Sequence, residues 1–127
     1  MSNKYVPEKL EINYSNQSEG SKSIKLINNN FLVNNPNPEL ISVNQISEDK
    51  WIEFWQTLEK IGLWDLEELY EGCTLEGGFT WKIEISYETK EINSYGVNIE
   101  PKIVMGDKVY SVLEELYKSI EELISLD

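Results

Sequence analysis

The strongest strand signal in the chain is Phe79-Thr80-Trp81-Lys82-Ile83-Glu84-Ile85-Ser86-Tyr87, in which large apolar side chains alternate strictly with polar ones. Successive side chains of a strand point to opposite faces of its sheet, so this alternation predicts a strand with one buried face. Residues 88–91 can turn the chain into a second strand around 92–99, which Pro101 ends. Gly96 inside that strand indicates a bulge or a close approach of the backbone. The stretch therefore predicts a hairpin whose apolar face must be covered by other elements.

Two amphipathic helices are predicted to cover it, one on each side of the hairpin in the sequence. For the first, Ser47 is the expected N-cap and Gly62 the expected left-handed stop. Its apolar residues recur at spacings of three and four and are Trp51, Phe54, Trp55, Leu58 and Ile61. A shorter helical turn is expected over residues 65–70. For the last helix Asp107 is the expected cap. Its apolar stripe consists of Val109, Val112, Leu113, Leu116, Ile120, Leu123 and Ile124.

The N-terminal third of the chain predicts two strands. Residues 10–14 alternate apolar and polar side chains, and the alternation restarts at 24–26 after a polar turn. A turn at 28–30 separates this second strand from the apolar residues 31–33. The Asn/Pro-rich residues 34–38 break the chain, and residues 40–46 are expected to form a loop along the edge of the core.

Taken in order, these elements predict a single α+β domain over residues 1–127 with the order ββαββα. Residues 1–46 form its two-strand N-terminal part with the Asn/Pro loop, and residues 47–127 supply helix, hairpin and helix. A four-stranded antiparallel sheet with both helices packed on one face would bury all the apolar stripes.

The bulk composition is that of one folded domain. The chain has 127 residues, of which 40% are hydrophobic and 11% aromatic, and this is too apolar for a disordered chain. No apolar run approaches the roughly 20 residues of a membrane-spanning helix, and the N-terminal residues lack the apolar core of a secretory signal. The single cysteine, Cys73, cannot form an internal disulfide. We therefore expect a cytoplasmic protein.

The net charge is −12, and it is unevenly distributed along the chain. Residues 1–46 sum to zero, residues 47–76 to −7, residues 77–105 to −1 and residues 106–127 to −4. The two strongly negative segments are those predicted to be helical. Nucleic acid and anionic membrane surfaces would be repelled by this charge, whereas a basic protein would be attracted. The alternative interpretation is that the acids serve only solubility.

The residue types present point away from catalysis. Histidine is absent, which removes Ser–His and Cys–His nucleophilic sites, histidine bases and histidine-containing zinc sites. Cys73 lies in an acidic stretch, where neighbouring carboxylates disfavour a reactive thiolate. The carboxylates show no EF-hand spacing, and Gly77-Gly78 is more typical of a turn than of a phosphate-binding loop. We therefore expect no enzyme activity, no metal and no cofactor.

A protein-binding surface is the remaining kind of site. Trp51, Trp55 and Trp81 fall on predicted apolar faces and are interpreted as core. Trp64 and Tyr70 lie in an acidic connection, where exposed aromatic rings surrounded by acids would make a binding hot spot. With the acids of the last helix they give the candidate partner-binding residues. These are Trp64, Asp65, Glu67, Glu68, Tyr70, Glu71, Glu114, Glu115, Glu121 and Glu122.

From residue 51 onward the chain follows a longer pattern, W-x-x-F-W-x-x-L-x-x-I-x-x-W-x-W, then Y, then D-G-x-x-W-x-V-x-I-x-Y, then S-x-G-x-N-x-Y-P. The matching residues are Trp51, Phe54, Trp55, Leu58, Ile61, Trp64, Tyr70, Gly77, Trp81, Ile83, Ile85, Tyr87, Ser94, Gly96, Asn98 and Pro101. On these residues the chain resembles a family of small uncharacterised bacterial proteins over about half its length. It departs from the pattern at Leu66, at one extra residue before Trp81, and at Ile99-Glu100 before the proline. The resemblance supports the fold and leaves two interpretations of the polar Ser94 and Asn98: they satisfy a loop, or they mark a small recognition surface.

Two functions fit these observations. The first is a non-enzymatic inhibitor that binds and occludes a basic partner protein, of the toxin-immunity or the phage anti-defence type. The second is a sensor or adaptor domain that recognises a small ligand or a peptide. It would use an apolar pocket or a free edge strand such as residues 10–14. The acidic helical segments favour the first function, and the composition suits a bacterial or a phage genome equally.

Overall fold

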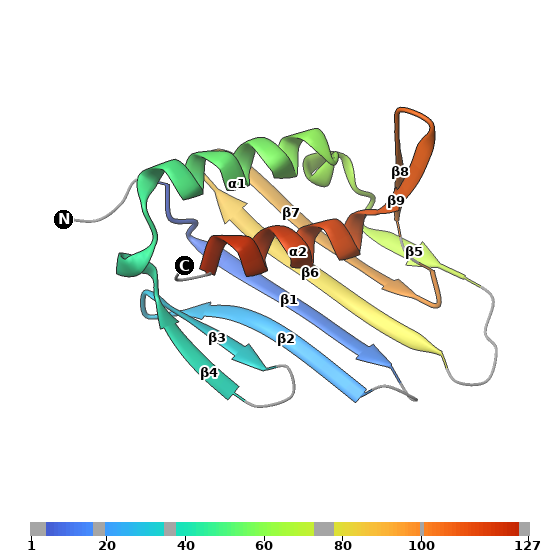
Figure 1. The fold of residues 1–127 in the computed structure, drawn as a ribbon. Helices are drawn as coiled ribbons and strands as arrows, with labels where there is room; N and C mark the ends of the chain where they lie inside the picture. Colours follow the sequence, from blue (N-terminus) through green and yellow to red (C-terminus); the bar gives the residue numbers. More distant parts are fainter. Residues whose placement is uncertain (1–4, 17–19, 35–37, 73–77, 100, 125–127) are drawn as a thin grey trace.

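The computed structural model describes residues 5–16, 20–34, 38–72, 78–99 and 101–124. Its main body is a seven-stranded sheet with two α-helices lying on one face (Figure 1). The strands are β1 (Lys9–Asn16), β2 (Gly20–Ile27), β3 (Asn30–Asn34), β4 (Pro38–Ser42), β5 (Leu69–Glu71), β6 (Phe79–Tyr87), β7 (Lys90–Val97), β8 (Lys102–Met105) and β9 (Lys108–Ser111). The helices are α1 (Glu48–Lys60) and α2 (Val112–Ile124), with 3₁₀ turns η1 (Val43–Gln45) and η2 (Leu63–Asp65).

The strand order in the main sheet is β4-β3-β2-β1-β6-β7-β5, and β8 pairs with β9 in a separate two-stranded sheet. Neighbouring strands of the main sheet are antiparallel except β5, which runs parallel to β7. The prediction of a four-stranded antiparallel sheet in ββαββα order is therefore wrong. The described chain is mostly sheet, and its N-terminal part contributes four strands instead of two.

The alternation in residues 79–87 does form a strand, β6, which lies between β1 and β7. Ile83 pairs with Ile12 on one side and with Ser94 on the other, and all three side chains are buried. β1 is an interior strand because its apolar face continues that of β6. The expectation that residues 10–14 offer a free edge is therefore wrong.

β3 forms over the apolar residues 31–33, and β4 forms where the sequence predicts a breaker and a loop. Asn28 and Asn29 join β2 to β3 with φ angles of 48° and 64°, the left-handed values of a two-residue hairpin turn. β4 then pairs with β3 along its whole length, although it has no alternating pattern. An edge strand contacts one neighbour only, so it tolerates an exposed Leu40.

The first helix has the predicted boundaries. The Ser47 hydroxyl oxygen accepts a hydrogen bond from the Lys50 backbone N–H at 3.3 Å, which caps α1. Gly62 follows the helix with a φ of +77°, the left-handed conformation expected of a stop.

The second helix begins later than predicted, at Val112. Gly106, with a φ of +70°, helps turn β8 into β9, and this hairpin takes up the residues expected to start the helix. Ser111 replaces Asp107 as the cap, because its hydroxyl accepts the Glu114 N–H at 3.2 Å. Val109 is therefore 62% exposed on a hairpin and is absent from the buried stripe of the helix.

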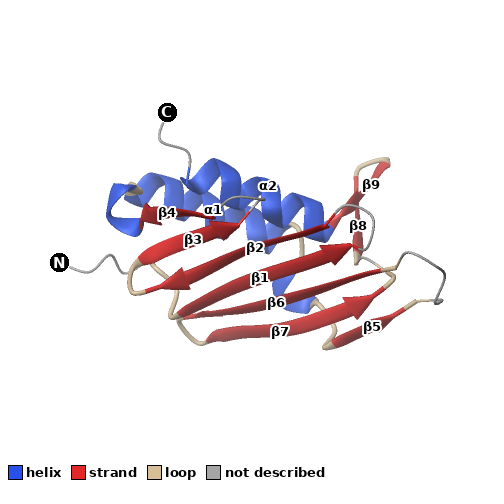
Figure 2. Cartoon of the chain, turned by 90° about the horizontal axis from the view of Figure 1, so that it is seen from below, coloured by secondary structure: helices blue, strands red, loops and turns tan. Residues whose placement is uncertain are grey.

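The core lies between the sheet and the helices. α1 contributes Trp51, Phe54 and Leu58, and α2 contributes Leu116 and Ile120, all of them buried. The opposite face of the sheet is not covered by any helix or strand of the described residues (Figure 2). None of the helices in the described ranges is long and apolar enough to cross a membrane.

Candidate functional site

The helix layer, which consists of α1 and α2, is the acidic face of the molecule. The two helices lie side by side on the sheet and run in opposite directions (Figure 1). They carry eight carboxylates and three lysines, a net charge of −5. The exposed acids are Glu48, Asp49, Glu53, Glu59, Glu114, Glu121 and Glu122. A partner approaching this layer meets an excess of negative charge.

The structure places the four predicted acids of α2 along the solvent side of that helix. Glu114 and Glu121 are seven residues apart, which is close to two helical turns, and Glu115 and Glu122 share that spacing. Glu115 is half-buried and the other three are exposed. Lys118 lies between the two acidic pairs, so α2 keeps a net charge of −3.

The predicted residues between Trp64 and Glu71 divide into exposed acids and half-buried rings. The exposed acids are Asp65, Glu67, Glu68 and Glu71. Tyr70 packs its ring on Trp81 at 5.7 Å between centroids, and its hydroxyl accepts the Glu67 backbone N–H at 3.0 Å. Tyr70 supports this connection through these contacts, and Trp64, which is equally half-buried, stacks on Trp55 with 6.2 Å between ring centroids.

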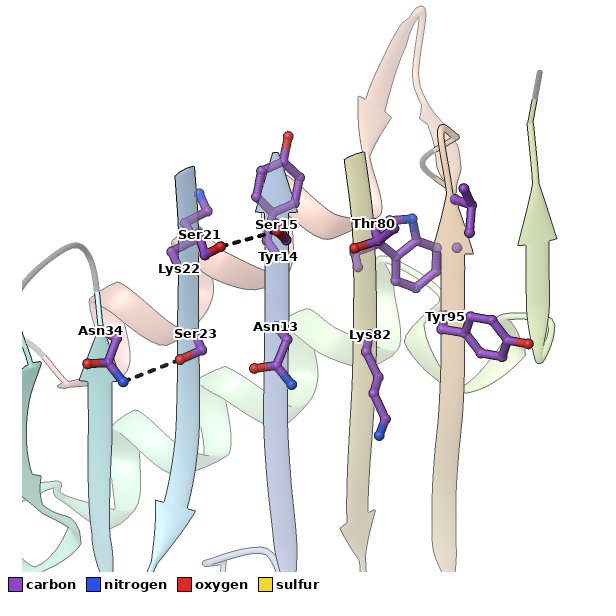
Figure 3. Close-up of a pocket in the computed structure, with 13 residues that line it drawn as sticks. Asn13, Tyr14, Ser15, Ser21, Lys22, Ser23, Asn34, Thr80, Lys82 and Tyr95 are labelled. Carbon is purple, nitrogen blue, oxygen red and sulfur yellow. Dashed lines mark hydrogen bonds between the residues drawn. The ribbon is translucent and has the colours of Figure 1, made fainter. Parts of the chain in front are cut away.

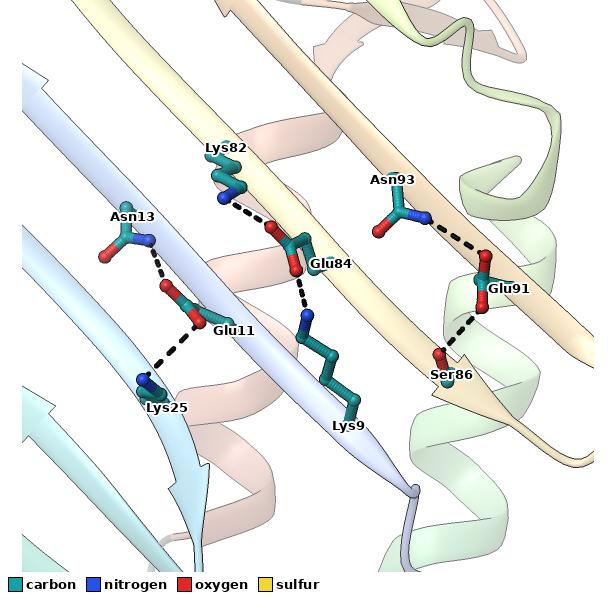
Figure 4. A network of polar contacts seen from close by, with 9 residues as sticks. All are labelled: Lys9, Glu11, Asn13, Lys25, Lys82, Glu84, Ser86, Glu91 and Asn93. Carbon is teal, nitrogen blue, oxygen red and sulfur yellow. Dashed lines mark hydrogen bonds and ion pairs between the residues drawn. The ribbon is translucent and has the colours of Figure 1, made fainter.

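The open face of the sheet, which is the side turned away from the helices, has balanced charges. On the four central strands β2, β1, β6 and β7 it carries Lys9, Lys25 and Lys82 with Glu11, Glu84 and Glu91 (Figure 4). Glu84 contacts both Lys9 and Lys82, and Lys25 lies 3.8 Å from Glu11. Glu91 accepts hydrogen bonds from Asn93 and Ser86. Each of the three acids therefore has a partner on the sheet.

The Glu84 contacts shift the protonation of both partners. Hydrogen bonds from Lys82 and then from Lys9 hold the pKa of Glu84 below its ordinary value. The same hydrogen bond, with the charge of Glu84, raises the pKa of Lys82. The ion pairs therefore stay charged at neutral pH, and they cancel each other's field over the open face.

One end of the open face is hollowed to a volume of about 890 Å³ (Figure 3). Its lining combines hydroxyl, amide, aromatic and lysine side chains with Gly96 and Val97, and it contains no carboxylate among the described residues. Asn34 donates a hydrogen bond to Ser23 at 3.4 Å, and Ser21 donates one to Ser15 at 3.1 Å. Tyr95 lies on β7 beside Lys82, with 48% of its surface exposed. The hollow could hydrogen-bond an uncharged polar molecule.

The polar residues of the family-like pattern hold loops in place. The Ser94 hydroxyl is buried and donates to the Glu67 carbonyl oxygen. Asn98, with a φ of +59°, accepts the Phe79 N–H on its side-chain oxygen at 2.9 Å. A Cβ on Gly96 would collide with the Trp81 indole, so the close backbone approach predicted there is confirmed. These contacts favour the loop interpretation of Ser94 and Asn98.

A second hollow lies between α1, η2 and the turn that joins β6 to β7, and we call it the aromatic cavity. It has a volume of about 210 Å³. It is lined by Tyr5, Ile52, Trp55, Gln56, Glu59, Trp64, Tyr87, Glu88 and Lys90. The sequence does not reveal it, because Trp55 and Tyr87 belong to predicted apolar patterns and therefore look like core residues. The one available signal is an exposed acid near each ring: Glu59 lies one helical turn after Trp55, and Glu88 directly follows Tyr87.

Cys73 and Gly77 lie outside the described residues. Within the described ranges no three acidic side chains gather closely enough to hold a metal ion. Comparison of the chain with protein-family models, with curated proteins and with solved structures gives no match. The resemblance to a family of small bacterial proteins therefore stays a prediction.

Proposed function

We propose that this protein is a non-enzymatic binding protein whose acidic helix layer docks on a basic partner protein and occludes it. One observation carries the proposal: the helix layer has a net charge of −5, whereas the charged side chains on the open face of the four central strands sum to zero. Acids that served only solubility would have no reason to be in excess on one face and balanced by lysines on the other.

The physical reason for a basic partner is complementarity of charge. A one-sided field speeds the encounter with an oppositely charged surface and orients it, and the effect weakens as salt screens it. Occlusion of an active or nucleic-acid-binding surface would make the protein an inhibitor, of the toxin-immunity or the phage anti-defence type. The cytoplasmic location expected from the sequence belongs to the same proposal.

The experiment is a pull-down from host lysate with mass spectrometry, run at low and at high salt. We expect one basic protein to be captured near stoichiometry and to be lost at high salt. The variant E114Q/E121Q/E122Q, which neutralises three exposed acids of α2, should capture less of it. The control variant E11Q/E84Q/E91Q removes the same number of negative charges, but from the open face. It should capture as much of the partner as the wild type does. If the amount of captured protein changes neither with salt nor in the α2 variant, the proposal is contradicted.

A second candidate function is recognition of a small uncharged polar ligand, and the hollow on the open face favours it. Its volume of about 890 Å³ falls in the range of small-molecule sites. A neutral sugar or nucleoside that raises the melting temperature of the wild type, but not of a Tyr95→Ala variant, would support this function. A panel of such ligands without any effect would count against it.

A further inference from the structure

The aromatic cavity presents ring surface to solvent. Trp55 stacks on Tyr87 with 3.9 Å between ring centroids and an angle of 8°, and Trp64 lies 6.2 Å from Trp55. The Trp55 indole N–H donates to the Tyr5 carbonyl oxygen at 2.8 Å, which fixes the orientation of the ring. All three rings are half-buried, so each packs on the protein and still reaches the surface. The rings form a rigid wall for a ligand.

Carboxylates stand at the rim of this cavity. Glu59 on α1 and Glu88 in the β6–β7 turn are both exposed lining residues. Burial raises the pKa of the Tyr87 hydroxyl, and the nearby negative charge of Glu88 raises it further. Glu88 is therefore close enough to act on the Tyr87 ring. The faces of aromatic rings are electron-rich and attract cations, most strongly at tryptophan. Rings and acids together give the cavity a preference for a positive group.

The chain already places a cation of its own in this position. The Lys90 ammonium lies 5.6 Å from the centre of the Trp64 ring and 3.9 Å from a Glu59 carboxylate oxygen. The side chains of Lys90 and Glu59 are 47% and 72% exposed, so the ion pair is weak and the lysine can move away. Lys90 thus marks where an incoming cationic group would be held.

We propose that the aromatic cavity binds an arginine side chain of the basic partner, and that Lys90 moves out as the arginine enters. The proposal rests on the function proposed above and names the anchor of that interaction. Arginine suits the cavity better than lysine because its planar guanidinium can stack on Trp64 while its N–H groups pair with Glu59. Buried aromatic and arginine contacts are also the usual centres of binding energy in interfaces.

The test uses a probe that needs no partner, N-acetyl-arginine methylamide, titrated while the indole N–H signals of Trp55 and Trp64 are followed by NMR. We expect both signals to move, with a dissociation constant on the order of millimolar. Lys90→Ala should bind the probe about two- to fivefold more tightly, and Glu59→Gln about two- to fivefold more weakly. Lys118→Ala removes an exposed lysine from α2 and should leave the affinity unchanged. All three substitutions are at exposed positions, so the fold is retained.

Three results would overturn the proposal. The first is indole signals that do not respond to the probe, and the second is an affinity that Lys90→Ala leaves unchanged. The third is tighter binding of tetramethylammonium, which lacks the planar guanidinium, because the cavity would then be a site for small quaternary ammonium compounds.

Failure of this inference can be told apart from failure of the proposed function. If the arginine probe binds but no basic protein is captured, the cavity is a cation site and the docking function is wrong. If a basic protein is captured through the α2 acids but the probe does not bind, the docking function stands and the anchor lies elsewhere.

Discussion

The helix layer and the open face of the sheet are both rich in charged side chains, yet they differ in how the charges are arranged. On the open face, Glu84 contacts two lysines and Glu11 lies near a third, so the field cancels within the sheet. On the helix layer, acids such as Glu114 and Glu121 have only Lys118 between them. Similar residues therefore produce a neutral surface on one side and an attractive surface for cations on the other.

The largest effect is expected from a substitution that weakens the packing of the helix layer on the sheet. Leu116 on α2 is fully buried, and Leu116→Ala should lower the free energy of unfolding by about 2–5 kcal/mol, because it removes apolar contacts and leaves a cavity. The matched change on the sheet edge, Leu40→Ala, affects a side chain that is 66% exposed and should cost less than about 0.5 kcal/mol. Urea unfolding of both variants measures the difference. Equal losses would show that α2 does not pack as described.

The next effect concerns the contact between the two central strands β6 and β7. Gly96→Ala should cost about 1–3 kcal/mol, because the added methyl group overlaps the Trp81 indole. Near-ultraviolet circular dichroism should change with it as the indole moves. Gly106→Ala meets no atom within 4 Å and should cost only about 1 kcal/mol, from its left-handed φ of +70°. A Gly96→Ala variant as stable as the wild type would contradict the close approach.

A smaller effect is expected from the paired charges of the open face. The folded pKa of Glu84 is lowered, so its charge stabilises the fold above its ordinary pKa of 4.5, and this contribution is lost as the pH falls through the folded value. Glu84→Gln should cost at most about 1 kcal/mol at neutral pH, since the lysines are half exposed. The cost should vanish in acid.

The smallest effect is the response of stability to salt. The acids in excess on the helix layer repel one another, and salt screens this repulsion, so salt should raise the melting temperature of the wild type slightly. E114Q/E121Q/E122Q should reduce that rise, because the variant removes three of the repelling charges. E11Q/E84Q/E91Q should not reduce it, because it leaves lysines without partners. If E11Q/E84Q/E91Q reduced the salt-induced rise in melting temperature more than E114Q/E121Q/E122Q does, the open face and not the helix layer would carry the repelling charges.

The long periodic segments of the sequence were enough to predict α1, β6 and β7. Their boundaries follow from local chemistry, such as the Ser47 cap and the stop at Gly62. The short strands could not be predicted in this way. β5 has three residues and no pattern, and it exists because β7 offers a neighbouring edge. Val109 lies three residues before Val112, which is a helical spacing, yet the hairpin turned at Gly106 places Val109 in β9 and leaves Val112 to begin α2.

The acidic segments of the candidate site are visible in the sequence, whereas the cancellation of charge on the sheet is not. Lys9 and Glu84 are far apart in the chain and meet only because β1 pairs with β6. The aromatic cavity is hidden for the same reason, since Trp55, Trp64 and Tyr87 come from three elements. Strand order decides which charges meet, and the sequence pattern does not contain strand order.

The most direct measurement is the affinity of the captured basic partner for the two triple variants, determined by calorimetry at low salt. Both variants raise the net charge from −12 to −9, so a difference between them reports position and not total charge. We expect E114Q/E121Q/E122Q to bind at least about tenfold more weakly than E11Q/E84Q/E91Q, which should match the wild type. Equal affinities would contradict the claim that the helix layer is the binding face.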